Sequence, residues 1–128
     1  MKGARSRRGG LARRSGRRAE VLAALILLAK GYRILGFRLK TPQGEIDLLA
    51  QRGRVLAVVE VKRRTTIDAA LEAVGHVQRE RLRRAAAQIA ARRPRLQDVA
   101  VRLDLFAFAP GRWPRHLADA WREESDLK

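Results

Sequence analysis

Three charged side chains interrupt two short apolar runs of this sequence. Asp47 falls within GEIDLLA (residues 44–50), and Glu60 and Lys62 end the run VLAVVEVK (residues 55–62). Hard divalent cations such as Mg²⁺ and Mn²⁺ prefer oxygen ligands, and a cation so bound can activate water and polarise a phosphoryl oxygen. The ammonium group of Lys62 could orient that water or neutralise charge on a phosphate. These residue types and this spacing fit the parts of a phosphodiester hydrolase.

A predicted hairpin brings these side chains together. Both runs are typical of strands, and QRGR between them supplies a glycine for a tight turn. If the hairpin folds symmetrically about its turn, Asp47 faces Glu60 and Glu45 faces Lys62. Because strand side chains alternate between faces, all four would share one surface, provided that no bulge shifts the register.

A simpler alternative leaves the hairpin with ion pairs alone. Two facing carboxylates repel each other, so an arginine, Lys62 or a divalent cation must hold them together. In the alternative, Glu45 pairs with Lys62, while Asp47 and Glu60 are solvated or bound by arginines. The run before Glu60 is apolar on both faces, as in a central strand, where an unsatisfied carboxylate is unfavourable. This feature favours the metal site.

The charge balance predicts a polyanionic partner. The chain has 128 residues and a formal net charge of +16, from 29 basic and 13 acidic residues. Eight of the basic residues, and no acidic one, precede Ala19. Nucleic acid is therefore expected ahead of an anionic membrane. The sequence has no cysteine and two histidines, which excludes thiolate metal sites, gives little support to zinc and favours a reducing compartment.

The elements around the hairpin predict one α/β domain. Residues 1–16 are interpreted as a disordered basic arm and residues 17–128 as a single domain. A first helix is predicted over residues 17–30, where the apolar run of nine residues is too short to span a membrane. Helical periodicity resumes near Ile67 and is strongest over residues 78–93. Strands are predicted at residues 32–39, 45–50, 55–62 and 99–109, and the segment RWPRHLADAW is left open as a strand or a helix.

The two motifs together resemble a known signature. Asp47 followed by Glu60-Val61-Lys62 resembles the D…(D/E)-x-K signature of the restriction-endonuclease-like, or PD-(D/E)xK, nuclease superfamily. GEIDLLA followed by VVEVKRR is similar to the YraN family of small bacterial proteins, which are similar to Holliday junction resolvases. The likeness extends, in order, to GYRIL, QRERLRRAA, RLD and WPRHLADAW.

This resemblance implies a restriction-endonuclease-like fold, in which helices flank a central mixed sheet. It implies that Asp47, Glu60 and the Val61 carbonyl bind Mg²⁺ or Mn²⁺, with Asp47, Glu60 and Lys62 catalytic. It also implies Glu20 as an additional metal ligand. The sequence departs from the family pattern at Ile46 (often proline), Arg38-Leu39-Lys40 (usually Asn-aromatic-Arg) and Arg63 (usually Thr).

Other charged and aromatic residues have two interpretations each. Predicted contacts to nucleic acid are made by Arg63, Arg64, Gln78, Arg81 and Arg84. For the helical residues among these, the alternative is an ordinary solvated face, and Glu20 could serve only to favour its helix dipole. His76 and His116 are expected at the surface or an interface, Trp113 and Trp121 in packing, and Arg102 paired with Asp104.

The leading interpretation is a Mg²⁺- or Mn²⁺-dependent endonuclease that acts on DNA, including branched DNA, in the bacterial cytoplasm. The alternative is a non-catalytic nucleic-acid-binding module that retains the nuclease fold, and a basic ribosome- or membrane-associated protein ranks third. No membrane partner is expected. Resolving a branched junction would need two coordinated sites, and hence a homodimer, for which the sequence shows no interface.

Overall fold

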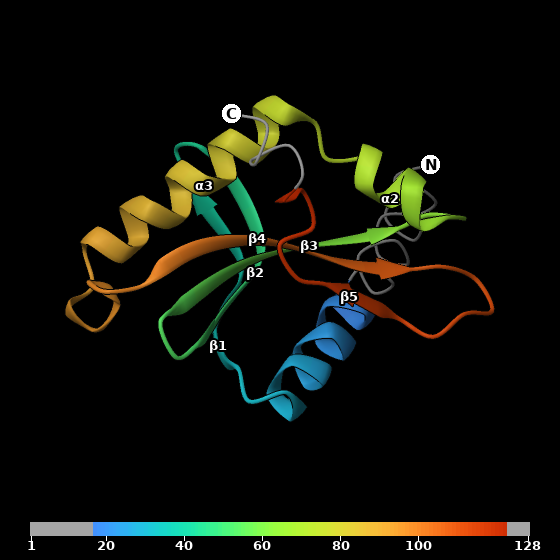
Figure 1. Cartoon of the computed structure of the whole chain (residues 1–128), viewed down its shortest axis with the longest axis horizontal. Coiled ribbons are helices and arrows are strands. Elements are labelled where there is room, and N and C mark those ends of the chain that lie inside the picture. The colour runs from blue at the N-terminus through green and yellow to red at the C-terminus, as the bar shows by residue number, and fades with distance from the viewer. Residues whose placement is uncertain (1–16, 123–128) are drawn as a thin grey trace, which may run out of the picture.

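The computed structural model describes residues 17–122, which form a five-stranded sheet with helices on both faces (Figure 1). The strand order is β1-β2-β3-β4-β5. Neighbouring strands pair antiparallel except β3 and β4, which are parallel, so the sheet is mixed. The strands are β1 (Arg33–Thr41), β2 (Gly44–Arg52), β3 (Val55–Arg63), β4 (Ala100–Phe108) and β5 (Arg115–Leu117).

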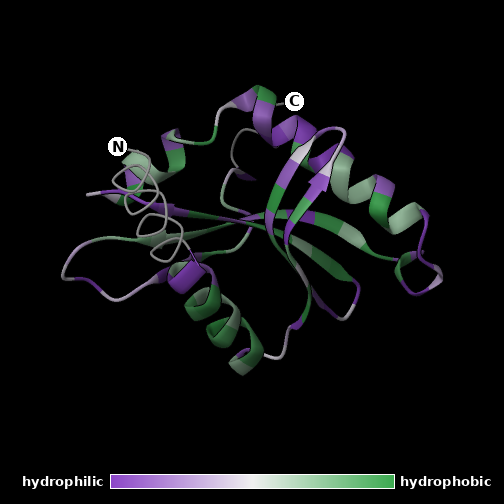
Figure 2. Ribbon diagram, turned by 180° about the vertical axis from the view of Figure 1, so that it is seen from behind, coloured by the Kyte–Doolittle hydropathy of each residue, from purple (hydrophilic) through white to green (hydrophobic). Residues whose placement is uncertain are grey.

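The helices divide the apolar core into two layers. A helix over residues 17–29 covers one face, where Ala23 and Leu27 pack on β2, β3 and Phe106. The other face is covered by α2 (Ile67–Glu72), α3 (His76–Ala91) and the short 3₁₀ helix η1 (Pro94–Leu96). Figure 2 shows hydrophobic residues on the first helix and along the central strands, and hydrophilic residues along α3.

The predicted α/β fold is confirmed, and it is consistent with a restriction-endonuclease-like fold. The parallel pairing of β3 with β4 requires a crossover, which α2 and α3 supply. The helix predicted over residues 78–93 is present as part of α3, and its Leu82 and Ala86 are buried against the sheet. The segment RWPRHLADAW, for which the sequence did not decide between a strand and a helix, contains β5. The predicted basic arm of residues 1–16 lies outside the described residues. Residues 17–122 contain no helix with the length and apolar character of a membrane span.

One buried acid adds to the backbone pairing that holds the edge strand β5 to β4. Asp104, which is fully buried, accepts hydrogen bonds from Arg102 (2.7 and 2.8 Å) and from the Asp119 backbone N–H (3.0 Å). His116 Nε2 lies 2.8 Å from the Asp104 carboxylate, and Lys30 Nζ lies 2.9 Å from His116 Nδ1. Since an ammonium group can only donate, the network assigns the ring proton to Nε2.

These contacts correct two expectations from sequence. His116 was expected at the surface or an interface, but pairing of β5 with β4 covers its side chain to 5% exposure. Trp113 was expected to pack, but it is 86% exposed because it precedes β5 in the connecting loop. Trp121 does pack, and its indole N–H donates to the Leu71 carbonyl (3.3 Å). The predicted pairing of Arg102 with Asp104 is confirmed.

Asp104→Asn should destabilise the protein by about 2–3 kcal/mol at pH 7, because it leaves the Arg102 guanidinium without its anion. Burial raises the pKa of Asp104, but hydrogen bonds from His116, Arg102 and the Asp119 backbone outweigh it and lower the pKa. The carboxylate therefore stabilises the fold above its ordinary pKa of 3.8, and this contribution is lost as the pH falls further. Urea denaturation at several pH values measures the difference. Asp98→Asn, at an exposed position, is the control, and an equal loss in both variants would contradict the prediction.

Candidate active site

The sheet divides between β2 and β3 at the predicted carboxylates. The two strands pair from Arg52 opposite Val55 to Leu48 opposite Val59, which is the register expected from the symmetric hairpin. The paired residues end there, one position before Asp47 and Glu60. Pairing of β1 with β2 continues to the hairpin turn, and pairing of β3 with β4 continues to Arg63. We call the gap that opens between β2 and β3 the fork.

The end of the β1–β2 hairpin bends toward α3 at the fork (Figures 1 and 2). A pocket of about 240 Å³ is lined jointly by hairpin residues including Lys40 and by α3 residues including Gln88. Strict alternation predicts that Ile46 shares a face with Leu48, yet Ile46 packs with Leu49 in the core layer beneath α3. The β1–β2 pairs skip Arg38 and Asp47, and Arg38 has a φ of 47°, so the alternation is interrupted at this position.

Asp47 replaces the missing backbone pairing with its side chain. Its Oδ2 accepts a hydrogen bond of 3.0 Å from the backbone N–H of Val61, across the fork. In an extended strand the N–H and C=O of one residue point to the same neighbouring strand. The Val61 carbonyl oxygen therefore also points into the fork.

Glu60 carries the unsatisfied group of the site. Its side chain is 1% exposed, and its Oε1 has no hydrogen-bond partner in the described part of the chain. Burial raises the pKa of Glu60 to about 8, and the neighbouring Asp47 carboxylate adds to this effect while Lys62 opposes it. A buried carboxyl of this kind must hold a proton or receive a cation.

The donors at the fork suit a hard divalent cation. Asp47 and Glu60 supply two carboxylates, and Val61 supplies a carbonyl oxygen, which are the ligand types that Mg²⁺ and Mn²⁺ prefer. Across residues 17–122, no group of three or more Asp, Glu, His or Cys side chains is placed to hold a metal. The remaining ligands of such an ion would therefore be water or substrate oxygens, as is usual for Mg²⁺.

Lys62 belongs to the same side of the sheet as Glu60, two residues further along β3. Its side chain is partly buried, and its positive charge lowers the pKa of Glu60. The fork thus brings together Asp47, Glu60, Val61 and Lys62, as the sequence predicted.

Glu20 is bound by an arginine. Arg38 Nε lies 3.1 and 2.9 Å from the two carboxylate oxygens of Glu20, which is 8% exposed. Arg38 follows Phe37, which pairs with Leu48, and so lies beside Asp47 in the β1–β2 register. The hydrogen bond to Glu20 raises the pKa of Arg38, and the charge of Asp47 contributes. The predicted role of Glu20 as a metal ligand stays a prediction, and it requires release from Arg38.

Arg38 is the site residue that sequence reasoning missed. It was noted as a departure from the family pattern, without a role. A signal was available in the hairpin register, because a second hairpin over β1 and β2 places Arg38 opposite Asp47. Its backbone has a φ of 47°, in the left-handed region that is rare for arginine.

The predicted nucleic-acid contacts fall on two surfaces. Arg63 and Arg64 are exposed at the end of β3, directly after Lys62, and line a pocket of about 480 Å³. Gln78, Arg81 and Arg84 are exposed and spaced three residues apart along α3, so they form one stripe of that helix. Their contacts to nucleic acid stay predictions.

Glu60→Gln should remove a pH dependence of stability in protein kept free of divalent ions with EDTA. Between the ordinary pKa of 4.5 and about 8, the folded carboxyl retains a proton that the unfolded chain has lost. The free energy of unfolding of the unaltered protein therefore falls as pH rises through this window, by on the order of a few kcal/mol. Urea denaturation between about pH 5 and pH 9 measures both slopes. Glu45→Gln, at an exposed position on β2, should keep the slope, and a flat profile for the unaltered protein would contradict the assignment.

Comparison with known proteins places every residue of the fork inside the region that a family model matches. The model of the "Uncharacterised protein family UPF0102" matches residues 19–108. A UPF0102 protein of Caulobacter vibrioides (strain NA1000 / CB15N) is 72% identical over 93% of this chain and 95% of its own length. The UPF0102 protein of Parvibaculum lavamentivorans is 57% identical over 89% of this chain and 86% of its own. That of Paramagnetospirillum magneticum is 50% identical, with 91% and 94% covered.

Proposed function

We propose that this chain, which belongs to the uncharacterised protein family UPF0102, is a metal-dependent endonuclease that hydrolyses phosphodiester bonds of DNA. It would then belong to the restriction-endonuclease-like, PD-(D/E)xK superfamily. The observation that carries the proposal is the buried, unpartnered Oε1 of Glu60 beside Asp47 in the fork. A sheet core that served stability alone would place an apolar side chain there.

Each residue of the fork would have its own role in such a reaction. Asp47 and Glu60, with the Val61 carbonyl, would hold one Mg²⁺ or Mn²⁺. The bound ion would supply an activated water and polarise the phosphoryl oxygen. Lys62 would direct its ammonium at the phosphate oxygen that gains charge as the water attacks. The Val61 N–H keeps Asp47 oriented, because it donates to Oδ2.

DNA is the favoured substrate on grounds of charge. The net charge of +16 suits a polyanion, and sequence-independent phosphate contacts would make the affinity strongly salt-dependent. Arg63 and Arg64 follow Lys62 directly and would bind phosphates that flank the scissile bond. We place the protein in the bacterial cytoplasm with its DNA, and action on a junction would require a homodimer.

The second candidate is a nucleic-acid-binding module without catalysis. One observation favours it: Arg38 binds the Glu20 carboxylate, so within residues 17–122 no third acid joins Asp47 and Glu60 to hold a metal. Salt-sensitive DNA binding without cleavage by any divalent ion would support this candidate.

The cleavage test uses a panel of labelled linear, flapped and four-way DNA substrates with Mn²⁺ or Mg²⁺. Asp47→Ala and Lys62→Ala should each lower the cleavage rate by at least about 100-fold, because each removes a group that acts on the reacting phosphate, while DNA affinity survives. Lys40→Ala removes the same charge from an exposed position and should retain activity. If all the variants nick DNA equally, the activity comes from a contaminant, and the catalytic assignment of Asp47 and Lys62 is refuted.

A metal-binding test does not require activity. At pH 8.5, where much of Glu60 has lost its proton, Mn²⁺ at about 100 times its Kd should raise the melting temperature by about 10 °C. Glu60→Gln should abolish the shift, since it removes an anionic ligand, and Glu45→Gln should keep it. Isothermal titration calorimetry gives the stoichiometry. Failure of the unaltered protein to bind either ion, with DNA present or absent, would favour the binding module.

A further inference from the structure

Trp113 is the most exposed large apolar residue of the described chain, at 86% exposure. It lies in the loop between β4 and β5, flanked by Arg112 and, one residue beyond Pro114, by Arg115. A solvent-exposed tryptophan contributes little hydrophobic free energy to folding, so core packing does not explain a tryptophan at this position. The arginines on either side indicate an anionic ligand with an aromatic or apolar surface.

The surface around Trp113 is hollowed. A pocket of about 90 Å³ has Trp113, Arg112, Arg115 and Arg64 among its walls, with Ala107 and Phe108 behind them. The larger pocket of about 480 Å³ at the end of β3 shares Arg64, Phe108 and Ala109 with it. The two pockets are therefore adjacent, and we call them together the β4–β5 hollow.

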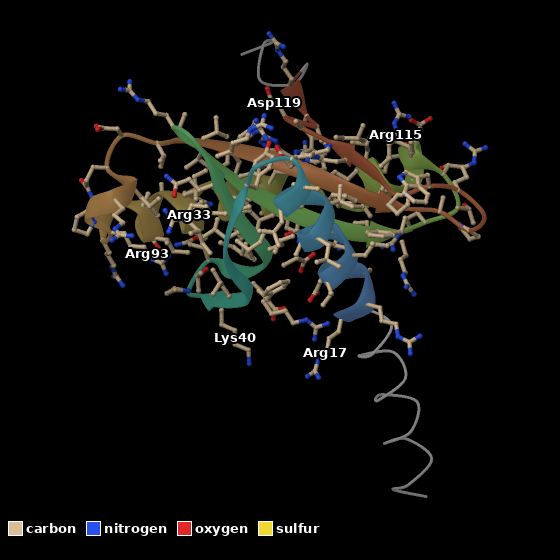
Figure 3. All side chains as sticks on the ribbon, turned by 90° about the horizontal axis from the view of Figure 1, so that it is seen from below. Arg17, Arg33, Lys40, Arg93, Arg115 and Asp119 are labelled. Carbon is tan, nitrogen blue, oxygen red and sulfur yellow. The ribbon has the colours of Figure 1, made fainter. Side chains whose placement is uncertain are left out.

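The smaller of these pockets lies near the fork, on the side of the sheet that carries Glu60 and Lys62. Lys62 pairs with Ala107 in the parallel ladder, and Ala107 pairs with Arg115. Ala107 packs in the core layer beneath α2 and α3, the side on which Glu60 and Lys62 also lie. With strands about 4.8 Å apart, the backbone of Arg115 lies roughly 10 Å from that of Lys62, which is a span of a few nucleotides. Figure 3 shows Arg115 at the opposite end of the molecule from Arg93, which follows α3.

The loop holds Trp113 outward before any ligand arrives. Pro114 restricts the backbone of the preceding residue to extended conformations. Gly111 has a φ of 69°, and the Arg112 N–H donates to the Ala109 carbonyl (3.2 Å), which closes a turn. A backbone already restricted in this way loses little conformational entropy when the indole binds.

We propose that Trp113 stacks on an unpaired nucleobase while Arg64, Arg112 and Arg115 bind the adjoining phosphates. Indole stacking tolerates every base, and arginine binds phosphate in the same groove, which is the usual chemistry of single-strand recognition. Bases inside a continuous duplex are already stacked and are not available to an indole. The substrate class is therefore DNA with unpaired nucleotides beside the scissile bond, such as a branch, flap or gap. The position of this hollow relative to catalysis rests on the proposed function.

Binding without divalent ions tests the inference. Trp113→Ala should weaken the affinity for a single-stranded oligothymidylate by about 5- to 150-fold, the loss of one stacked base, and Trp113→Phe should restore most of it. Affinity for a blunt duplex of equal length should change less than about twofold. Leu25→Ala, another exposed apolar residue, is the matched control and should leave both affinities unchanged. Because Trp113 is solvent-exposed, its removal leaves the fold intact, which a melting curve verifies.

Fluorescence gives a second measurement on the unaltered protein. The chain has two tryptophans, and Trp121 is 7% exposed, so the emission that acrylamide quenches belongs to Trp113. Oligothymidylate should quench this emission and shield it from acrylamide, whereas the blunt duplex should do neither. Unchanged single-strand affinity of Trp113→Ala, or equal losses on single strand and duplex, would overturn the inference. An acidic peptide that competes equally well would indicate a protein partner and also overturn it.

Different results would refute the proposed nuclease activity and the proposed base stacking by Trp113. Cleavage that depends on Asp47 and Lys62, with single-strand affinity indifferent to Trp113, would remove the inference and retain the nuclease. Single-strand affinity that depends on Trp113, in a protein that cuts no substrate with either ion, would remove the nuclease and retain the base-stacking surface.

Discussion

The burial of the Glu60 carboxyl is the constraint on which the rest of this structure depends. A central strand of a mixed sheet is covered by helices on both faces, and a carboxylate there is unstable without a partner. At this point the pairing between β2 and β3 ends, while β2 remains paired with β1 and β3 with β4. The two acids lie just beyond the last β2–β3 pair. Repulsion between the carboxylates disfavours continued pairing, and the opened fork admits a cation or a proton.

A second buried acid of the same fold has hydrogen-bond partners for both of its carboxylate oxygens. Asp104 receives hydrogen bonds from two side chains and one backbone N–H, its pKa is lowered, and it ties the edge strand to the sheet. Glu60 retains an unpartnered oxygen, and its pKa is raised. The contrast between the two groups distinguishes a structural acid from the one that we propose to bind a metal ion.

Charge and topology place the candidate functions at one end of the sheet. Because β3 and β4 run parallel, their C-terminal ends emerge together, and the arginines after Lys62 meet the loop that carries Trp113. Two acids near the site are paired with arginines: Arg38 binds Glu20, and Arg102 binds Asp104. A phosphate chain entering from the arginine side would meet Lys62 before the carboxylates of the fork.

The sequence by itself determined the fold class, the hairpin register and the grouping of Asp47, Glu60 and Lys62, because local alternation and turn chemistry encode these features. It did not determine where the ladder ends, that Arg38 binds Glu20, that His116 is buried or that Trp113 is exposed. Those outcomes depend on contacts between segments far apart in the chain, such as Arg38 with Glu20 and His116 with Asp104. Tertiary packing alone decides such contacts, since each depends on how strands and helices are stacked and not on the residues next to it.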